Sequence, residues 1–201
     1  MLSSSFIKLM EVLPKPLVMK LAKMKVNGYM RKYAKINVKG LENIDKISGP
    51  KIFVCNHLSN SDALVLNEVL KRYDPTFVAG IKIINNPITS IGSMTVKKIA
   101  INPNVVDKDA IIKMVDILKR GNNLLIFPEG TRSRQGKMLE GKKGVLLVAK
   151  MSKATIIPIS MWGTEKLLPV NKDDNMSTEE WNFSDVNVVI NKAVEIPKKE
   201  K

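Results

Sequence analysis

The stretch IFVCNHLSNSDALVLNEVL, residues 52–70, decides the fold, because it passes from an apolar run through a polar turn into a helical pattern. Ile52–Cys55 is short, apolar and partly β-branched, which is typical of a buried strand. After Asp62 the apolar residues recur with helical spacing. His57, the only histidine of the chain, therefore lies on a strand-to-helix turn, where the chain can fold the Asp62 carboxylate back toward the imidazole.

The chain of 201 residues is long enough for one well-buried domain and short for two. From residue 36, short apolar runs alternate with helical segments, which predicts the α/β fold class. Residues 171–182 are predicted to form an exposed loop and 198–201 a frayed tail. The predicted strands are Ile36–Val38, Lys51–Cys55, Thr76–Ala79, Lys98–Ile101, Leu124–Phe127, Thr155–Ser160 and Val186–Ile190, with helices near 62–71, 107–120 and 142–150.

The formal net charge is +14 at pH 7, from 33 Lys and Arg against 19 Asp and Glu. Residues 1–39 hold nine basic residues and one acidic residue, so they carry eight of the fourteen excess positive charges. This balance indicates an anionic partner: a membrane surface, a nucleic acid, or an acidic protein or substrate. A basic nucleic-acid-binding protein is only a distant alternative. Aromatic residues, on which bases could stack, make up 5% of the chain, and the positive charge concentrates at one end.

Two amphipathic helices are predicted in this basic region. Residues 2–13 form the first, closed by Pro14 and Pro16, and the second runs from about Leu17 to Ala34. The second helix gathers apolar and aromatic side chains on one face and basic ones on the other, as an in-plane membrane anchor does. The alternative is that it packs on the protein's own core with its lysines in water. We therefore predict basic membrane-associating helices at 1–35 and a globular domain at 36–201.

The single cysteine, Cys55, excludes an intramolecular disulfide and a thiolate metal cluster, which fits a reducing, cytoplasmic setting. Since there is also only one histidine, no transition-metal site is predicted. A thiol nucleophile is the alternative role for Cys55, but a small buried residue at the end of a core strand is the simpler interpretation. No apolar run reaches the length of about 18 residues that a membrane span needs, and Lys8 and Glu11 interrupt the only signal-peptide candidate.

Unusual residues also follow other predicted strands. The block Phe127-Pro128-Glu129-Gly130-Thr131-Arg132-Ser133 follows one strand, and Lys82 follows another. A third predicted strand contains Ile157-Pro158-Ile159. Ligands of open α/β sheets bind beyond the carboxyl ends of the strands, so these loops are expected to share one rim with His57.

Together these blocks resemble the motifs of the glycerolipid acyltransferase family, of the bacterial 1-acyl-sn-glycerol-3-phosphate acyltransferase type. His57 and Asp62 match the family's His-x4-Asp block, and residues 127–133 match its Phe-Pro-Glu-Gly-Thr-Arg-Ser block in full. Ile157-Pro158-Ile159 resembles its hydrophobic-Pro-hydrophobic block, and order and separations agree from about residue 36 to 165. The resemblance implies a single acyltransferase domain with a mixed, mostly parallel sheet flanked by helices, preceded by the N-terminal amphipathic helices.

The resemblance also implies a reaction. A fatty acyl group would pass from acyl-CoA or acyl-acyl-carrier-protein to the sn-2 hydroxyl of 1-acylglycerol-3-phosphate, giving phosphatidic acid in phospholipid biosynthesis. No cofactor is expected beyond the donor as co-substrate, and neither nucleic acid nor metal is expected as a partner. The expected partners are an anionic membrane surface, the lysophospholipid and, for one of the donors, acyl carrier protein. The expected location is the cytoplasmic face of the cell membrane, as a peripheral or monotopic protein.

The histidine turn suits this chemistry. Acyl transfer from a thioester to an alcohol needs a base for the hydroxyl proton, and a neutral imidazole is well matched to neutral pH. His57 would be that base, and Asp62 would fix its tautomer and stabilise the imidazolium. Because the substrate hydroxyl is the nucleophile, no acyl-enzyme is required. A structural histidine with satisfied hydrogen bonds is the alternative.

The second block supplies candidate substrate-binding residues. Arg132 offers a planar, charged fork suited to a phosphate, and Gly130 and Thr131 lie where backbone N–H groups can approach a ligand. We expect Glu129 to orient Arg132 or a backbone donor rather than to touch the phosphate. Lys82 is a further candidate phosphate contact. The alternatives are a surface turn with an ion pair for the block and a solvated surface lysine for Lys82.

One family feature is missing. Family members usually carry an arginine that closes the segment between the two blocks and helps to hold the acceptor's phosphate, but residues 99–104 contain none. Lys82, Lys97 or Lys98 would replace that contact, or the acceptor would be glycerol-3-phosphate or another lysolipid.

Overall fold

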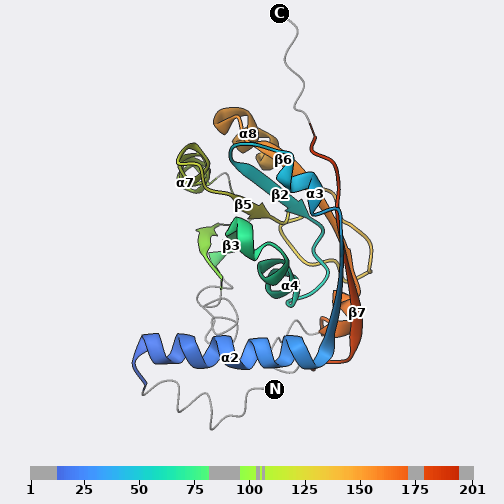
Figure 1. Ribbon diagram of the computed structural model, residues 1–201. Helices are drawn as coiled ribbons and strands as arrows, with labels where there is room; N and C mark the ends of the chain where they lie inside the picture. Colours follow the sequence, from blue (N-terminus) through green and yellow to red (C-terminus); the bar gives the residue numbers. More distant parts are fainter. Residues whose placement is uncertain (1–12, 82–95, 103–104, 106, 172–178, 195–201) are drawn as a thin grey trace, which may run out of the picture.

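The computed structural model describes residues 13–81, 96–102, 105, 107–171 and 179–194. In this part of the chain seven strands form one sheet in the order β1-β7-β6-β2-β5-β3-β4 (Figure 1). Only β6 and β7 pair antiparallel, so the predicted mixed, mostly parallel sheet is confirmed. Each predicted strand is present to within two residues at either end. The strands are β1 (Ala34–Lys39), β2 (Lys51–Cys55), β3 (Thr76–Gly80), β4 (Lys98–Ile101), β5 (Leu124–Ile126), β6 (Thr155–Trp162) and β7 (Ser184–Ile190).

Helices cover both faces of the sheet (Figure 1). Successive side chains of a strand point to opposite faces, so β2 contributes Phe53 to one core and Ile52 to the other. The first core contains side chains of α4 (Asp62–Val69) and α3 (Glu42–Asp45), and the second those of α7 (Lys108–Lys119) and α8 (Gly144–Ser152). The predicted helices near 62–71, 107–120 and 142–150 are thus present. The short elements α3, η1 (Lys71–Tyr73) and α9 (Thr164–Leu167) were not predicted.

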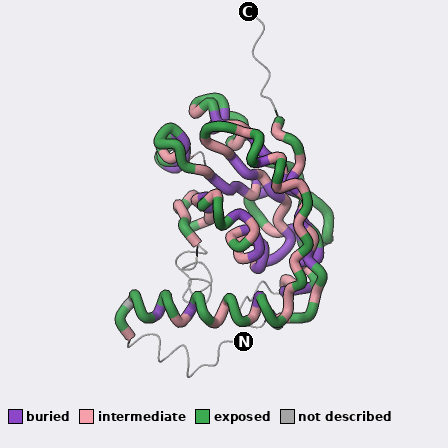
Figure 2. The backbone as a smooth tube through the Cα atoms, in the orientation of Figure 1, coloured by how far each residue is buried: buried purple, intermediate pink, exposed green. Residues whose placement is uncertain are grey.

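Helix α2 (Lys15–Tyr33) lies across one edge of the sheet, along the bottom of Figure 1. Its C-terminal half packs on the domain, because Met30 is buried in the first core and Val26 and Tyr33 pack against it. Much of the rest of its surface is exposed (Figure 2). The apolar face of α2 is therefore used at least in part by the protein's own core, while the division into parts at 1–35 and 36–201 stays a prediction.

The predicted helix at 2–13 lies outside the described residues. Of the helices that are described, none combines the length and the apolar character that crossing a membrane requires.

The edge that carries α2 also carries the ends of the central strands. β2, β5 and β6 run parallel to one another and therefore end at the same edge. β7 runs antiparallel to β6, and β1 parallel to β7, so β1 and β7 begin there. The loops that hold both motifs and the C-terminal end of α2 thus meet at one edge of the sheet.

The prediction of an exposed loop at 171–182 is wrong for Glu179 and Trp181, while Glu180 and Asn182 are exposed as predicted. Residues 172–178 lie outside the described part of the chain, but Glu179 is buried, with 6% relative exposure of the residue. Trp181 stacks on Tyr29 of α2 with a centroid distance of 5.6 Å and an interplanar angle of 11°. The polar composition of this segment thus gave no indication that Glu179 and Trp181 pack against the rest of the protein.

Candidate active site

His57 and Asp62 are in contact, as the sequence predicts. His57 Nδ1 lies 2.7 Å from Asp62 Oδ2, and the carboxylate is fully buried at the first turn of α4. The same oxygen accepts the backbone N–H groups of Leu58, at 2.6 Å, and Ser59, at 2.9 Å. Asp62 Oδ1 makes no hydrogen bond within the described residues. Three donors therefore converge on one oxygen, which fixes the orientation of the carboxylate.

The turn between β2 and α4 is anchored at both ends. The Asn56 side chain donates to the Met161 carbonyl and accepts from the Met161 N–H, each at 2.8 Å, which joins the turn to β6. Further along, Ser59 Oγ donates to the Leu168 carbonyl at 2.7 Å. The five-residue separation of His57 and Asp62 becomes a contact because the chain turns between two fixed points.

An aromatic neighbour orients the imidazole ring of His57. His57 stacks on Phe127 with a centroid distance of 4.1 Å and an interplanar angle of 16°. With Nδ1–H donating to Asp62, the neutral imidazole carries no proton on Nε2. Nε2 can then accept a proton from a substrate hydroxyl. The side chain of His57 is 15% exposed, which leaves the ring accessible at this edge.

Glu129 connects the two motifs through backbone groups. Its side chain is buried, with 4% relative exposure of the residue. One oxygen accepts the His57 N–H at 2.8 Å and the other accepts the Leu139 N–H at 2.9 Å. The His57 carbonyl in turn accepts the N–H of Ser133 at 2.8 Å. Of the two expectations for Glu129, the structure shows the backbone donor and not Arg132.

The turn at Gly130 favours a glycine. Its φ of +70° lies in the left-handed region, and a Cβ there would come within 3.0 Å of Lys142 Nζ. Gly130 and Thr131 are exposed, so this segment offers backbone at the surface beside Arg132. Lys142 is a cation near the candidate site that the sequence did not single out, because it lies nine residues beyond the end of the motif at Ser133.

Arg132 has a carboxylate partner that the sequence did not indicate. Its side chain is 10% exposed, and its Nη1 lies 3.4 Å from Oε1 of Glu179, whose side chain is 2% exposed. The other oxygen of Glu179 accepts the amide N–H of Asn60 at 2.6 Å. Glu179 stands alone in a polar segment with no motif around it, so no sequence signal pointed to it.

Of the lysines that were candidates for a phosphate contact, the structure describes Lys97 and Lys98. Lys82 lies outside the described residues. Lys97 is exposed and forms an ion pair with Asp74. Lys98 is in β4, and burial lowers the pKa of its ammonium. In the stretch without the arginine, the backbone and side chain of Asn102 donate to Asp107, which accepts the Ala110 N–H at the start of α7.

Cys55 is a core residue. It is 1% exposed, and burial raises the pKa of the thiol well above its usual value, with further contributions from the charges of Asp62 and Glu129. The thiol therefore stays protonated near neutral pH and is a poor nucleophile. Across the described ranges, His, Cys, Asp and Glu form no group of three suited to a metal ion.

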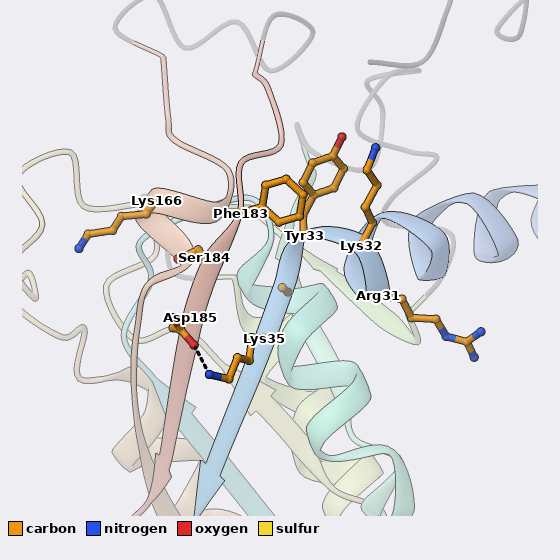
Figure 3. A pocket seen from close by; sticks show the side chains of 9 residues that line it. Arg31, Lys32, Tyr33, Lys35, Lys166, Phe183, Ser184 and Asp185 are labelled. Atoms are coloured by element: carbon orange, nitrogen blue, oxygen red, sulfur yellow. Dashed lines mark ion pairs between the residues drawn. The ribbon is translucent and has the colours of Figure 1, made fainter.

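A shallow pocket of about 470 Å³ lies where α2 passes into β1 (Figure 3). Figure 3 shows the rings of Tyr33 and Phe183 side by side in it, with a centroid distance of 4.9 Å. Lys35 forms an ion pair with Asp185 at 3.2 Å. Arg31 and Lys32 of α2 and Lys166 of α9 also line the pocket, and in Figure 3 their side chains point away from Asp185. His57, Asp62 and Arg132 are not among the lining residues, so this basic pocket is separate from the histidine site.

The family model described as Acyltransferase matches residues 35–162. A chloroplastic 1-acyl-sn-glycerol-3-phosphate acyltransferase of Arabidopsis thaliana is 31% identical over 165 residues, which cover 81% of this chain and 44% of that protein. A 1-acyl-sn-glycerol-3-phosphate acyltransferase of Borreliella burgdorferi is 29% identical over 141 residues, 68% of this chain and 55% of that protein. The chain therefore spans about half the length of these relatives.

A solved structure has the same fold. The crystal structure of the 1-acyl-sn-glycerophosphate acyltransferase of Thermotoga maritima superposes with a TM-score of 0.64 at 23% identity, covering 94% of this chain and 76% of that one. The family match includes both motif-bearing loops and more than half of the chain. The resemblance noted in the sequence is thereby confirmed, and the chain belongs to the Acyltransferase family.

Proposed function

We propose that this protein transfers a fatty acyl group from a thioester donor to the sn-2 hydroxyl of 1-acylglycerol-3-phosphate, giving phosphatidic acid. The observation that carries the proposal is the 2.7 Å contact between His57 Nδ1 and a fully buried Asp62 carboxylate. It leaves Nε2 as the basic nitrogen of the only histidine in the chain. The names of the relatives in several organisms support 1-acylglycerol-3-phosphate as the acceptor.

In the proposed reaction, the acceptor's hydroxyl oxygen attacks the thioester carbonyl carbon while Nε2 of His57 takes the hydroxyl proton. Asp62 stabilises the imidazolium that forms, as the carboxylate of a serine-protease triad does. The tetrahedral intermediate then breaks its C–S bond, the thiolate leaves, and the imidazolium returns the proton to it. The products are an ester and a free thiol, and the enzyme carries no covalent intermediate.

The loop Gly130–Arg132 would bind the acceptor's phosphate. A guanidinium pairs well with phosphate, and Arg132 is held 10% exposed beside the histidine turn. The Gly130 N–H already donates to the Phe127 carbonyl at 3.1 Å, so the exposed Thr131 is the backbone group next to Arg132 that would meet the phosphate. Lys82 remains a proposed phosphate contact from outside the described part of the chain.

The donor would be acyl-CoA or acyl-acyl-carrier-protein. Both present the same thioester, and the positive charge of this protein suits either the phosphates of CoA or an acidic carrier protein. The proposal requires no metal ion, cofactor or nucleic acid.

The acceptor would be taken from an anionic membrane surface on the cytoplasmic side. The motif loops lie at the same edge of the sheet as the end of α2 and the basic pocket of Figure 3. Arg31, Lys32 and Lys166 are exposed there, together with the Phe183 ring at 74% exposure. Basic residues next to an exposed aromatic ring suit the headgroup region of an anionic bilayer. The protein would then rest on the membrane as a peripheral or monotopic protein with its active site toward the lipid.

The second candidate is the same chemistry on another acceptor, glycerol-3-phosphate or another lysolipid, and the missing arginine at residues 99–104 favours it. A purified-enzyme assay that crosses labelled acyl-CoA and acyl-carrier-protein donors with a panel of acceptors separates the two. We expect 1-acylglycerol-3-phosphate to give the highest kcat/KM. A higher value for glycerol-3-phosphate or for a lysolipid with another headgroup would select the second candidate, and no transfer to any acceptor would reject both.

A further inference from the structure

Glu179 is a buried acid that lies outside both motifs and yet meets both of their loops. One oxygen lies 3.4 Å from Nη1 of Arg132 in the second loop. The other accepts the side-chain N–H of Asn60, at 2.6 Å, in the turn between His57 and Asp62. A carboxylate is costly to bury, so one that is 2% exposed requires the positive charge and the amide donor that it has here.

The segment that carries Glu179 is fixed at its far side. The Asn182 N–H donates to the Leu167 carbonyl at 2.9 Å, and Trp181 stacks on Tyr29 of α2. The carboxylate therefore enters the site from a segment that is itself held to α9 and α2. It offers a fixed point against which a long, flexible arginine side chain can be oriented.

Resting on the proposed function, we propose that Glu179 is a positioning residue for the acceptor's phosphate. It holds the guanidinium of Arg132 in the direction from which it meets the phosphate. Because Glu179 also accepts the Asn60 amide N–H, it fixes the position of that guanidinium relative to the turn that carries His57. The opposite role, in which Glu179 competes with the phosphate for Arg132, predicts tighter acceptor binding when the charge is removed.

The test compares Glu179→Ala, Glu179→Gln and the matched control Glu180→Gln, which removes the same charge from an exposed neighbour. Acceptor and donor KM and kcat are measured with 1-acylglycerol-3-phosphate. We expect Glu179→Ala to raise the acceptor KM by at least about tenfold, as loss of a hydrogen bond to a charged group does. The donor KM should stay unchanged. Glu179→Gln keeps the shape and one acceptor oxygen, so its effect should be smaller, and Glu180→Gln should match the wild type.

A double-mutant cycle decides whether Glu179 acts through Arg132. Once Arg132→Gln is present, Glu179→Gln should change kcat/KM by less than about twofold, because the residue it positions is gone. Losses that multiply in the double variant would overturn the proposal, as would a lower acceptor KM for Glu179→Gln. If Glu179→Ala does not fold, Glu179→Gln alone decides by the same criteria.

The proposal and the function on which it rests fail in different ways. A wild-type enzyme that acylates no phosphate-bearing acceptor overturns both. An active wild-type enzyme whose Glu179 variants behave like Glu180→Gln overturns the positioning role alone.

Discussion

Glu129 binds His57 through the backbone: its carboxylate accepts the His57 N–H at 2.8 Å, while the imidazole contacts Asp62 through Nδ1 at 2.7 Å. A residue from the loop after β5 thus helps to place the base from the loop after β2. The two strands are neighbours in the sheet, with Val54 in register with Ile126. The two sequence motifs are therefore parts of one hydrogen-bonded unit, in which Glu129 has no need to touch the substrate.

Glu129→Gln should lower kcat and stability without raising the acceptor KM. An amide has one acceptor oxygen, so its NH2 group would face one of the two partly buried N–H groups that now donate to the carboxylate. An unsatisfied buried donor costs about 1–3 kcal/mol, which is roughly 2–12 °C in Tm for a chain of this size. Steady-state kinetics and thermal denaturation measure both effects. A raised acceptor KM at unchanged kcat and Tm would instead indicate direct contact with the phosphate.

Asp62→Asn should be a milder change than Asp62→Ala. All three donors meet Oδ2, so the amide oxygen of asparagine can take its place and still accept His57 Nδ1–H. The loss is then mainly that of the negative charge facing the imidazolium. We expect the alanine variant to lose about 10²–10⁴-fold in kcat and the asparagine variant clearly less. Because the chain has a single histidine, ¹⁵N NMR of its ring reports the tautomer directly; an Nε2–H tautomer in Asp62→Asn would contradict this account.

Cys55 should be dispensable and unreactive. Burial raises the pKa of its thiol, so the folded protein should resist thiol reagents at pH 8 and react at once when denatured. The thiol binds its proton more tightly in the folded protein than in the unfolded one. It therefore adds stability below the pKa that it has in the unfolded chain, about 8.5, and this contribution falls as the pH rises above that value. Cys55→Ala should keep its activity and show a weaker loss of stability between pH 8 and about 9.5. Rapid labelling of the native thiol with loss of activity would contradict the core assignment.

The basic edge should bind anionic vesicles. Reversing the charges of Lys32 and Lys166 to Glu should weaken binding to phosphatidylglycerol vesicles by more than about tenfold, since each basic residue contributes about 1 kcal/mol at such a surface. The loss should shrink in high salt. The double reversal of Lys119 and Lys150 to Glu is the matched control, because these lysines are exposed on α7 and α8 and lie outside the basic pocket. Equal binding of the double variant and the control would show that another surface holds the membrane.

The sequence was informative wherever a local pattern determines the structure. Apolar runs such as Lys51–Cys55 gave each strand to within two residues, because buried strands need such runs. The motif around His57 and Asp62 predicted their contact, since a short turn limits where the carboxylate can lie. The alternation of strands and helices predicted the sheet type for the same reason.

What the sequence could not give are contacts between distant segments. Glu179 meets Asn60 from 119 residues away, and Asn56 holds Met161 from 105 residues away. Such contacts depend on how the loops pack at the edge of the sheet, and the identity of a single polar residue does not predict that packing. The same holds for Trp181, whose polar neighbours suggested a solvated loop although its ring stacks on Tyr29.

The most direct test of the account is the kcat of His57→Ala in acyl transfer from acyl-CoA to 1-acylglycerol-3-phosphate. Circular dichroism and the Tm are compared with the wild type to confirm that loss of the ring stacked on Phe127 leaves the fold intact. The account predicts a fall in kcat of about 10²–10⁴-fold or more, as for loss of a general base. A folded His57→Ala protein with kcat within about tenfold of the wild type would contradict it.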